Sequence, residues 1–192
     1  METKLKMLKE IYVKNGSYAR ELCRNLNLGM PSVKNSLNQL KEMLTARRGG
    51  RNINYTVNYS NKGVIPYLYL VEYSRIEELP KKAQYALFDY MKSLKNKPIL
   101  TIIFGSYARN EYSRNSDLDL LLVFNKVTKE AEEKARVVSS KYGLTLAPVY
   151  LQYGAFSKEF FNQKKKFFQD LKKDKIILNG IEWWVELKNE EA

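Results

Sequence analysis

Two aspartates at the start of an apolar run have the spacing of a metal site. Asp117 and Asp119 flank Leu118, and the apolar residues continue to Phe124, which is the length of a buried strand. Side chains at positions i and i+2 of a strand point to the same face, so we expect the two carboxylates to lie together. Two carboxylates on one face suit a hard cation, Mg²⁺ or Mn²⁺.

A Gly-Ser pair precedes these aspartates by ten residues. Gly105 and Ser106 follow the β-branched run Ile99–Phe104, which predicts another buried strand. Gly105 permits a sharp turn and a close approach by a ligand, and Ser106 is expected to cap a short helix that ends at Arg109. The free N–H groups at the start of such a helix favour phosphate oxygens.

A phosphate cradle beside a carboxylate pair indicates a specific chemistry. A divalent cation held there neutralises the attacking and leaving oxygens when a nucleoside triphosphate is attacked at its α-phosphate. The simpler alternative is a solvated Asp-x-Asp turn before a strand. The joint presence of the strand, the Gly-Ser pair and the spacing argues against that alternative.

The pattern resembles the minimal nucleotidyltransferases of the polymerase-β superfamily, which include kanamycin nucleotidyltransferase-like proteins and antitoxins that adenylylate their partner toxins. The resemblance spans about residues 80 to 182 and is carried by Phe104–Arg109 and Ser116–Leu120, with Glu111 also in agreement. It implies Mg²⁺-dependent transfer of a nucleotidyl group from ATP or another NTP to a hydroxyl of a protein, an RNA or a small molecule. It also implies the roles of six site residues: catalytic and metal-binding Asp117 and Asp119, and nucleotide-binding Gly105, Ser106, Arg109 and Ser116.

The chain departs from the family pattern at two places. Asn110 stands where a glycine is common, and residues 144–152 contain no acid, although many members carry a third carboxylate on a later strand. We therefore keep a second hypothesis. In it the chain is a DNA-binding transcriptional regulator whose nucleotidyltransferase-like domain is catalytically weak and senses nucleotide or binds a partner.

Composition excludes several other chemistries and points to an acidic partner. The 192 residues contain no histidine and one cysteine, Cys23, so a His-activated nucleophile and an ordinary zinc site are excluded, and Cys23 is expected in the core. Residues 1–62 carry 12 lysines and arginines against four glutamates, a net charge of +8 out of the total of +12. This concentration predicts a nucleic-acid-binding module in the first third of the chain.

The N-terminal third has the pattern of a helical DNA-binding domain. Apolar spacing predicts helices over residues 3–14, 18–25 (capped by Ser17) and 31–43, and then a hairpin over residues 44–58 around Gly49-Gly50. In the hairpin, Ile53, Tyr55 and Val57 are expected to point inward. Three helices and a basic hairpin resemble a winged helix-turn-helix domain.

Polar side chains on the third helix and the hairpin are candidates for contacts with double-stranded DNA. Short amides and hydroxyls on the helix can reach base edges, whereas the arginines of the hairpin can hold phosphates or enter a minor groove. The alternative is a merely solvated basic surface. The candidates are Ser32, Lys34, Asn35, Asn38, Gln39, Lys41, Arg47, Arg48 and Arg51.

The expected architecture is α+β, with a winged helix at residues 1–60 and a nucleotidyltransferase domain at 61–192, in which helices flank a small mixed sheet. Residues 64–73 are left open as a strand, a helix or a dimerisation segment, and a homodimer stays open too. Beyond them we expect three helices, over residues 80–95, over 128–142 (capped by Thr128) and from Ser157 through Leu171. We also expect a strand over residues 144–152 and a hairpin formed by 175–178 and 181–187, with Trp183 or Trp184 facing the core. No apolar run approaches the ~20 residues of a membrane span, and no signal peptide is evident, so a cytoplasmic protein is expected.

Overall fold

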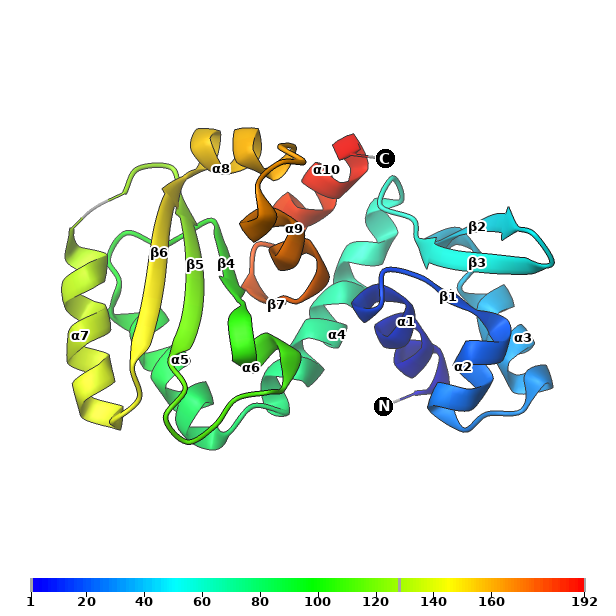
Figure 1. The fold of residues 1–192 in the computed structure, drawn as a ribbon, viewed down its shortest axis with the longest axis horizontal. Coiled ribbons are helices and arrows are strands. Elements are labelled where there is room, and N and C mark those ends of the chain that lie inside the picture. The colour runs from blue at the N-terminus through cyan, green and yellow to red at the C-terminus, as the bar shows by residue number, and fades with distance from the viewer. Residues whose placement is uncertain (1, 128, 192) are drawn as a thin grey trace. The chain divides into compact units, whose positions relative to one another are not determined.

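The computed structural model describes residues 2–127 and 129–191, which form two compact units (Figure 1). The first unit comprises the residues up to Val71 together with Lys188–Glu190, and the second comprises Glu72–Leu187 with Glu191. The boundary at residue 60 stays a prediction. The cap expected at Thr128 lies outside the described residues. No helix in the described ranges combines the length and the apolar character that crossing a bilayer requires.

The first unit combines helices with a three-stranded antiparallel sheet of order β1-β3-β2. The helices and the hairpin predicted for this region are confirmed. Buried apolar residues of α1 and α3, such as Leu8 and Val33, form the core of the unit. Its elements are α1 Thr3–Val13, β1 Ser17–Tyr18, α2 Ala19–Leu26, α3 Met30–Gln39, a 3-10 turn Lys41–Met43, β2 Leu44–Gly49, β3 Asn52–Val57 and a 3-10 turn Lys62–Val64.

Two local predictions in the first unit are wrong. Ser17 does not cap α2: it is buried in β1, and the carboxylate of Glu21 accepts hydrogen bonds from the N–H of Tyr18 at 3.0 Å and from the hydroxyl of Ser17 at 3.1 Å. Ile53 is 46% exposed, because it lies near the tip of the hairpin, opposite Arg48, whereas Val57 at the other end of β3 is buried. Cys23 is half-buried.

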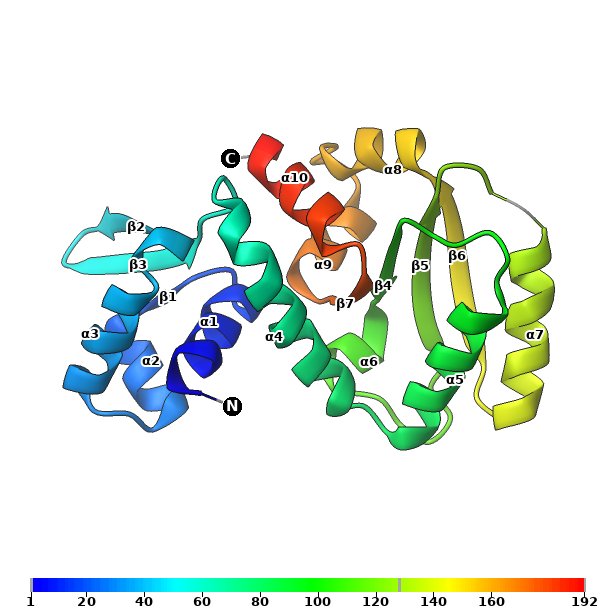
Figure 2. The same cartoon turned by 180° about the vertical axis from the view of Figure 1, so that it is seen from behind.

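The second unit contains a mixed sheet of order β6-β5-β4-β7 (Figure 2). β4 runs antiparallel to both β5 and β7, and β5 runs parallel to β6. The predicted α+β class with a small mixed sheet and flanking helices is thereby confirmed. The strands are β4 Leu100–Ile103, β5 Leu118–Phe124, β6 Leu146–Gln152 and β7 Ile176–Asn179. The helices are α4 Ile65–Glu77, which contributes residues to both units, α5 Lys81–Ser93, α6 Gly105–Arg109, α7 Glu130–Tyr142, α8 Tyr153–Phe160, α9 Lys166–Lys173 and α10 Ile181–Glu191.

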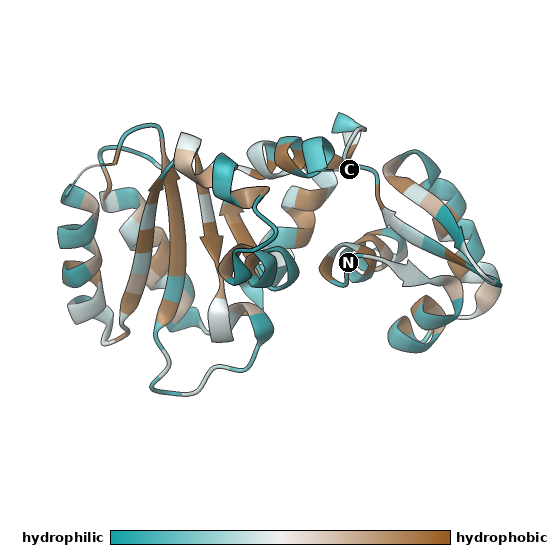
Figure 3. Cartoon of the chain, turned by 45° about the horizontal axis from the view of Figure 1, so that its top comes forward, coloured by the Kyte–Doolittle hydropathy of each residue, from teal (hydrophilic) through white to brown (hydrophobic). Residues whose placement is uncertain are grey.

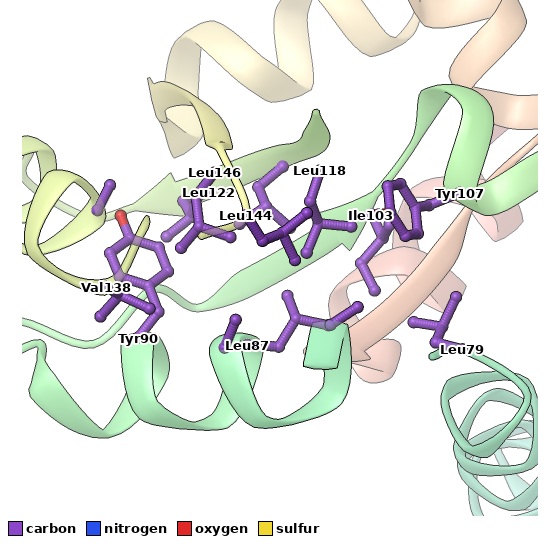
Figure 4. Packing of buried hydrophobic residues seen from close by; sticks show 14 of the residues in the cluster. Leu79, Leu87, Tyr90, Ile103, Tyr107, Leu118, Leu122, Val138, Leu144 and Leu146 are labelled. Carbon is purple, nitrogen blue, oxygen red and sulfur yellow. The ribbon is translucent and has the colours of Figure 1, made fainter. Parts of the chain in front are cut away.

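One face of this sheet packs on α5 and α7, and Asp119 belongs to the other face. Alternate residues of β5, including Leu118 and Leu122, pack on α5 and α7 around the buried ring of Tyr90 (Figure 4). The strands are largely hydrophobic along their length, as the brown ribbon in Figure 3 shows. Asp119 belongs to the opposite set of β5 residues, because side chains alternate along a strand. The carboxylate is therefore directed away from the core that α5 and α7 cover.

Two predictions near the C-terminus are wrong, and one open alternative is resolved. Residues 181–187 form helix α10 instead of a strand, because the buried Ile181, Trp184 and Val185 follow helical spacing. The helix expected from Ser157 through Leu171 is two helices, α8 and α9, with Ser157 inside α8. Residues 65–77 form the helix α4.

Gly180 makes the turn between β7 and α10. Its φ is +84°, and a Cβ at this position would lie 2.8 Å from the Cα of Leu100 and would overlap the carbonyl oxygen of Ile99. Only glycine fits so close to the neighbouring backbone, and the turn lets the chain leave the sheet as a helix.

Candidate active site

The ends of all four strands of the second unit meet at one edge of the sheet. Ile103, the last residue of β4, pairs with Leu120 near the start of β5 and with Ile176, the first residue of β7. Leu118 pairs with Leu146, so β5 and β6 also begin together. The Gly-Ser pair after β4 and the aspartates at the start of β5 therefore meet, as the sequence predicted.

Gly105 and Asp119 are in direct contact at this edge. The N–H of Phe104 donates to the carbonyl oxygen of Asp119 at 3.1 Å, which joins the two segments. Gly105 has a φ of +67°, and a Cβ built there would overlap Oδ2 of Asp119. The glycine thus leaves the space that the carboxylate occupies, in a backbone conformation that other residues rarely adopt.

Replacing Gly105 by alanine should therefore destabilise the protein and displace the Asp119 carboxylate. The left-handed conformation alone costs about 1–2 kcal/mol for a residue with a Cβ. Chemical denaturation measures the loss. The matched control is Gly154→Ala in α8, where a Cβ meets no atom within 4 Å; this change should be neutral or stabilising by up to about 1 kcal/mol. Equal stabilities of the two variants would contradict the contact with Asp119.

The electrostatics of the pair favour a bound cation. The pKa of Asp119 is raised above its ordinary 3.8, first by burial and then by the charge of Asp117, while Arg109 lowers it by a smaller amount. Two carboxylates that repel each other in a partly buried site are stabilised by a divalent cation with oxygen ligands. The residues present therefore fit Mg²⁺ or Mn²⁺.

Arg109 lies at the end of α6, beside three acids. Its Nε donates to Oε2 of Glu111 at 2.7 Å, and this hydrogen bond is the main reason that the pKa of Arg109 is raised; Asp174 and Asp119 raise it further. Asp174 was not found from the sequence. The feature that could have indicated Asp174 is its position just before β7, because this strand begins at the same edge of the sheet as β5.

The two serines predicted to bind nucleotide have different surroundings. Ser106 is the second residue of α6 and does not cap it: the N-cap is Phe104, and the Ser106 carbonyl accepts the N–H of Glu111 at 2.9 Å. The hydroxyl of Ser116 accepts the N–H of Ser113 at 2.8 Å and so fixes the turn before Asp117. Ser116 is therefore engaged in shaping the loop.

A cavity of about 560 Å³ adjoins Asp119. Asp119 and Phe104 contribute to one part of its lining, and residues of β6 and α7 contribute the rest, among them Ala147, Glu132 and Arg136. Glu132 and Arg136 pair at 3.2 Å, and both are well exposed. These α7 residues had no distinguishing signal in the sequence, where they belong to an ordinary charged helix face.

The pairing of β5 with β6 defines the position that faces Asp119 on the neighbouring strand. Ala147 is the direct partner of Asp119. Among residues 2–127 and 129–191, no three His, Cys, Asp or Glu side chains come close enough together to hold a metal. The carboxylate of Glu159, an acid of α8, accepts from Nδ2 of Asn162 at 3.2 Å and lies 3.9 Å from Nζ of Lys165.

The candidates for DNA contacts lie in the first unit. The polar residues of α3 alternate with the buried Val33 and Leu37, so that they occupy the outward side of this helix, and the arginines lie on the β2–β3 hairpin. All nine are exposed: Ser32, Lys34, Asn35, Asn38, Gln39, Lys41, Arg47, Arg48 and Arg51.

Comparison with known sequences identifies the family of this chain. The sequence profile of the nucleotidyltransferase domain family matches residues 85–188, more than half of the chain. The chain belongs to this family. The matched residues include the Gly105-Ser106 pair, Asp117 and Asp119, so the membership of the nucleotidyltransferase family that these residues predicted is confirmed.

Similarity to two individual proteins covers only part of this chain. A protein of Methanocaldococcus jannaschii named "putative protein adenylyltransferase" is 37% identical over 57 residues, which cover 29% of this chain. This chain spans only 58% of that relative's length. The crystal structure of a nucleotidyltransferase from Sulfolobus solfataricus, itself named as putative, aligns with 55% of this chain and 84% of its own at 22% identity, with a TM-score of 0.31. A score this low supports no structural argument.

Proposed function

We propose that the chain is a Mg²⁺-dependent nucleotidyltransferase that uses ATP or another NTP and transfers the nucleotidyl group to a hydroxyl of a protein, an RNA or a small molecule. The observation that carries this proposal is the Asp119 carboxylate packed against Gly105, with Asp117 beside it, at the edge where β4 and β5 meet. Family membership supports the reaction class.

Each proposed site residue has a role that follows from its chemistry. Asp117 and Asp119 hold the cation, which when bound withdraws charge from the phosphate oxygens. Gly105 and Ser106 contribute backbone N–H groups to the β- and γ-phosphates, since glycine lets a ligand approach the chain closely. Arg109 adds positive charge near the leaving pyrophosphate, and Ser116 orients Asp117 through its turn.

A direct test of this proposal is calorimetric titration of the protein with ATP in the presence and in the absence of Mg²⁺. We expect measurable binding only with the cation, because the carboxylates and the triphosphate repel each other without it. Equal affinities with and without Mg²⁺ would contradict the assignment of Asp117 and Asp119.

We further propose that residues 1–60 form a winged helix that binds double-stranded DNA. The proposal is supported by the order of helices and strands in the first unit, by the exposed polar side of α3 and by the net charge of +8 over residues 1–62. In this arrangement α3 enters the major groove, and Arg47, Arg48 and Arg51 of the hairpin hold phosphates.

Replacing Arg47, Arg48 and Arg51 by alanine should weaken binding to every duplex alike. The log–log dependence of affinity on salt should become shallower by about 0.9 for each phosphate that is no longer held. Replacing Asn35 and Asn38 by alanine should instead reduce discrimination between sites, by roughly 1–3 kcal/mol for each base that is no longer recognised. Fluorescence anisotropy over a salt series measures both. Identical effects of the two sets on random and selected duplexes would leave only a non-specific basic surface.

One observation favours a second candidate function. Ala147 occupies the position opposite Asp119, where a carboxylate on the neighbouring strand would face the cation. A site with two acids still binds a nucleotide, but it lacks a third acid to help activate the acceptor hydroxyl. The alternative is a DNA-binding regulator whose nucleotidyltransferase domain senses nucleotide or binds a protein partner.

A further inference from the structure

Two exposed phenylalanines flank a run of three lysines where the loop after α8 leads into α9. Phe161 and Phe167 are 39% and 38% exposed, and Lys164, Lys165 and Lys166 between them are all exposed. We call these five residues the α8–α9 surface. The exposed part of each ring offers an apolar surface within reach of three positive charges.

The α8–α9 surface adjoins the candidate active site through one ring. Phe167 contacts Phe104 edge-to-face, with centroids 5.2 Å apart. Phe104 in turn lines the cavity that contains Asp119, and its own N–H donates to the Asp119 carbonyl. A ligand that stacks on Phe167 therefore lies next to the residues proposed to hold the cation.

The surface is held in place by its own backbone. The side-chain oxygen of Asn162 accepts a hydrogen bond from the N–H of Lys164 at 3.1 Å. The main-chain carbonyl of Asn162 accepts one from the N–H of Lys165, also at 3.1 Å. The carbonyl of Lys165 accepts the N–H of Phe168 at 3.0 Å, where α9 begins. A fixed arrangement of rings and cations lowers the entropic cost of binding.

The charge of this surface is largely uncompensated by protein carboxylates. Within the part of the chain that the structure describes, Lys165 pairs with Glu159 at 3.9 Å, while Lys164 and Lys166 have no carboxylate within 4.0 Å. The phosphates of the nucleotide donor are already assigned to Gly105, Ser106 and the cation. The three lysines are thus available to a second polyanion.

We propose that the α8–α9 surface binds a single-stranded nucleic acid and that a ribose hydroxyl at the end of this strand is the acceptor of the nucleotidyl group. Aromatic rings that stack bases, together with lysines that follow the backbone, are the usual means of holding single strands without sequence preference. This proposal rests on the proposed nucleotidyl transfer, for which it names the class of acceptor. A folded protein acceptor would offer no series of bases to stack.

The ribose hydroxyl oxygen attacks the α-phosphorus and forms a new P–O bond. The bond between the α-phosphorus and the bridging oxygen to the β-phosphate breaks, and pyrophosphate leaves with the electron pair. The hydroxyl proton passes to water. The strand grows by one nucleotide, and no oxidant or reductant takes part.

The test measures binding of a fluorescent oligoribonucleotide of about ten residues. The full chain carrying Arg47, Arg48 and Arg51→Ala serves as the background, so that the first unit contributes little. Adding Phe161→Leu and Phe167→Leu should weaken binding by about tenfold or more, since the stacking of each base is removed. Adding instead Lys164, Lys165 and Lys166→Gln should make the log–log salt slope shallower by up to about two, at about 0.7 for each phosphate that is no longer held.

Matched controls lie on the opposite side of the sheet. Phe88→Leu, whose ring is 50% exposed on α5, and Lys92→Gln with Lys95→Gln should leave the affinity for the strand unchanged. All variants should keep the parent affinity for Mg·ATP. With α-labelled ATP and Mg²⁺, the label should appear on the oligoribonucleotide, and less so in the α8–α9 variants.

Unchanged strand affinity in the α8–α9 variants would overturn the inference, and so would label on a protein instead of on the strand. Loss of Mg·ATP affinity in the α8–α9 variants would also overturn it, because this surface would then bind the nucleotide donor. Failure of the parent protein to bind Mg·ATP, with strand binding as expected, would instead count against the proposed nucleotidyl transfer.

Discussion

Replacing Asp117 and Asp119 together by asparagine should abolish detectable binding of Mg·ATP. Asparagine keeps the shape of each side chain but removes both negative charges, and neutral amide oxygens are weak ligands for Mg²⁺. Isothermal titration calorimetry compares the variant with the parent. Glu77→Gln, an exposed acid of α4, is the control for loss of surface charge and should bind as the parent does.

The same double replacement should preserve or raise stability without metal. Burial and Asp117 raise the folded-state pKa of Asp119, so its ionised form is disfavoured relative to the unfolded chain. Stability is therefore lost as the pH rises through this pKa, and asparagine removes the loss. The gain in Tm should be present at neutral pH and vanish below the ordinary pKa of 3.8. A variant that binds Mg·ATP like the parent, or that unfolds, would contradict the assignment.

Introducing aspartate at Ala147 should increase the rate of nucleotidyl transfer by roughly tenfold or more, because a placed acid–base group typically contributes a hundredfold or more. Ala147 pairs with Asp119 across the parallel strands and contributes to the cavity lining, so a carboxylate there faces the cation from the neighbouring strand. Single-turnover transfer from labelled ATP to the oligoribonucleotide measures the rate.

The control for the Ala147 replacement adds the same charge to the same strand. Gln152 is the last residue of β6, is exposed and pairs with Phe124 at the far end of β5. Gln152→Asp should leave the transfer rate unchanged. Equal rates in the two variants would show that the position opposite Asp119 does not take part in the reaction.

The parts of the fold that the sequence predicts well are those with local causes. The strand before Gly105, the turn that it permits and the alternation around Asp117 and Asp119 follow from neighbouring residues, and the structure brings these residues together. The helices α5 and α7 likewise follow from apolar spacing. Pro80 stands at the start of α5 and Gly143 at the end of α7, where proline and glycine are common.

The parts that the sequence does not predict depend on distant residues. Tryptophan, isoleucine and valine favour strands, but α10 forms because its helical stripe can be buried after the turn at Gly180, where Trp184 packs edge-to-face on Phe160 of α8. The sequence does not tell which residue of β6 lies beside Asp119, and the register of the parallel strands identifies it as Ala147. Asp174, which approaches Arg109 from the start of β7, is separated from it by 65 residues of chain and has no local motif.

The most direct test of nucleotidyl transfer is a comparison of ATP labelled at the α-phosphate with ATP labelled at the γ-phosphate, each incubated with the full chain, Mg²⁺ and the oligoribonucleotide. Attack at the α-phosphorus transfers only the α-label and releases the γ-label in pyrophosphate. We predict α-label on the acceptor, none from γ-labelled ATP, and no transfer by the variant with asparagine at positions 117 and 119. Transfer of the γ-label, or α-label transfer that survives this double replacement, would contradict the proposed active site.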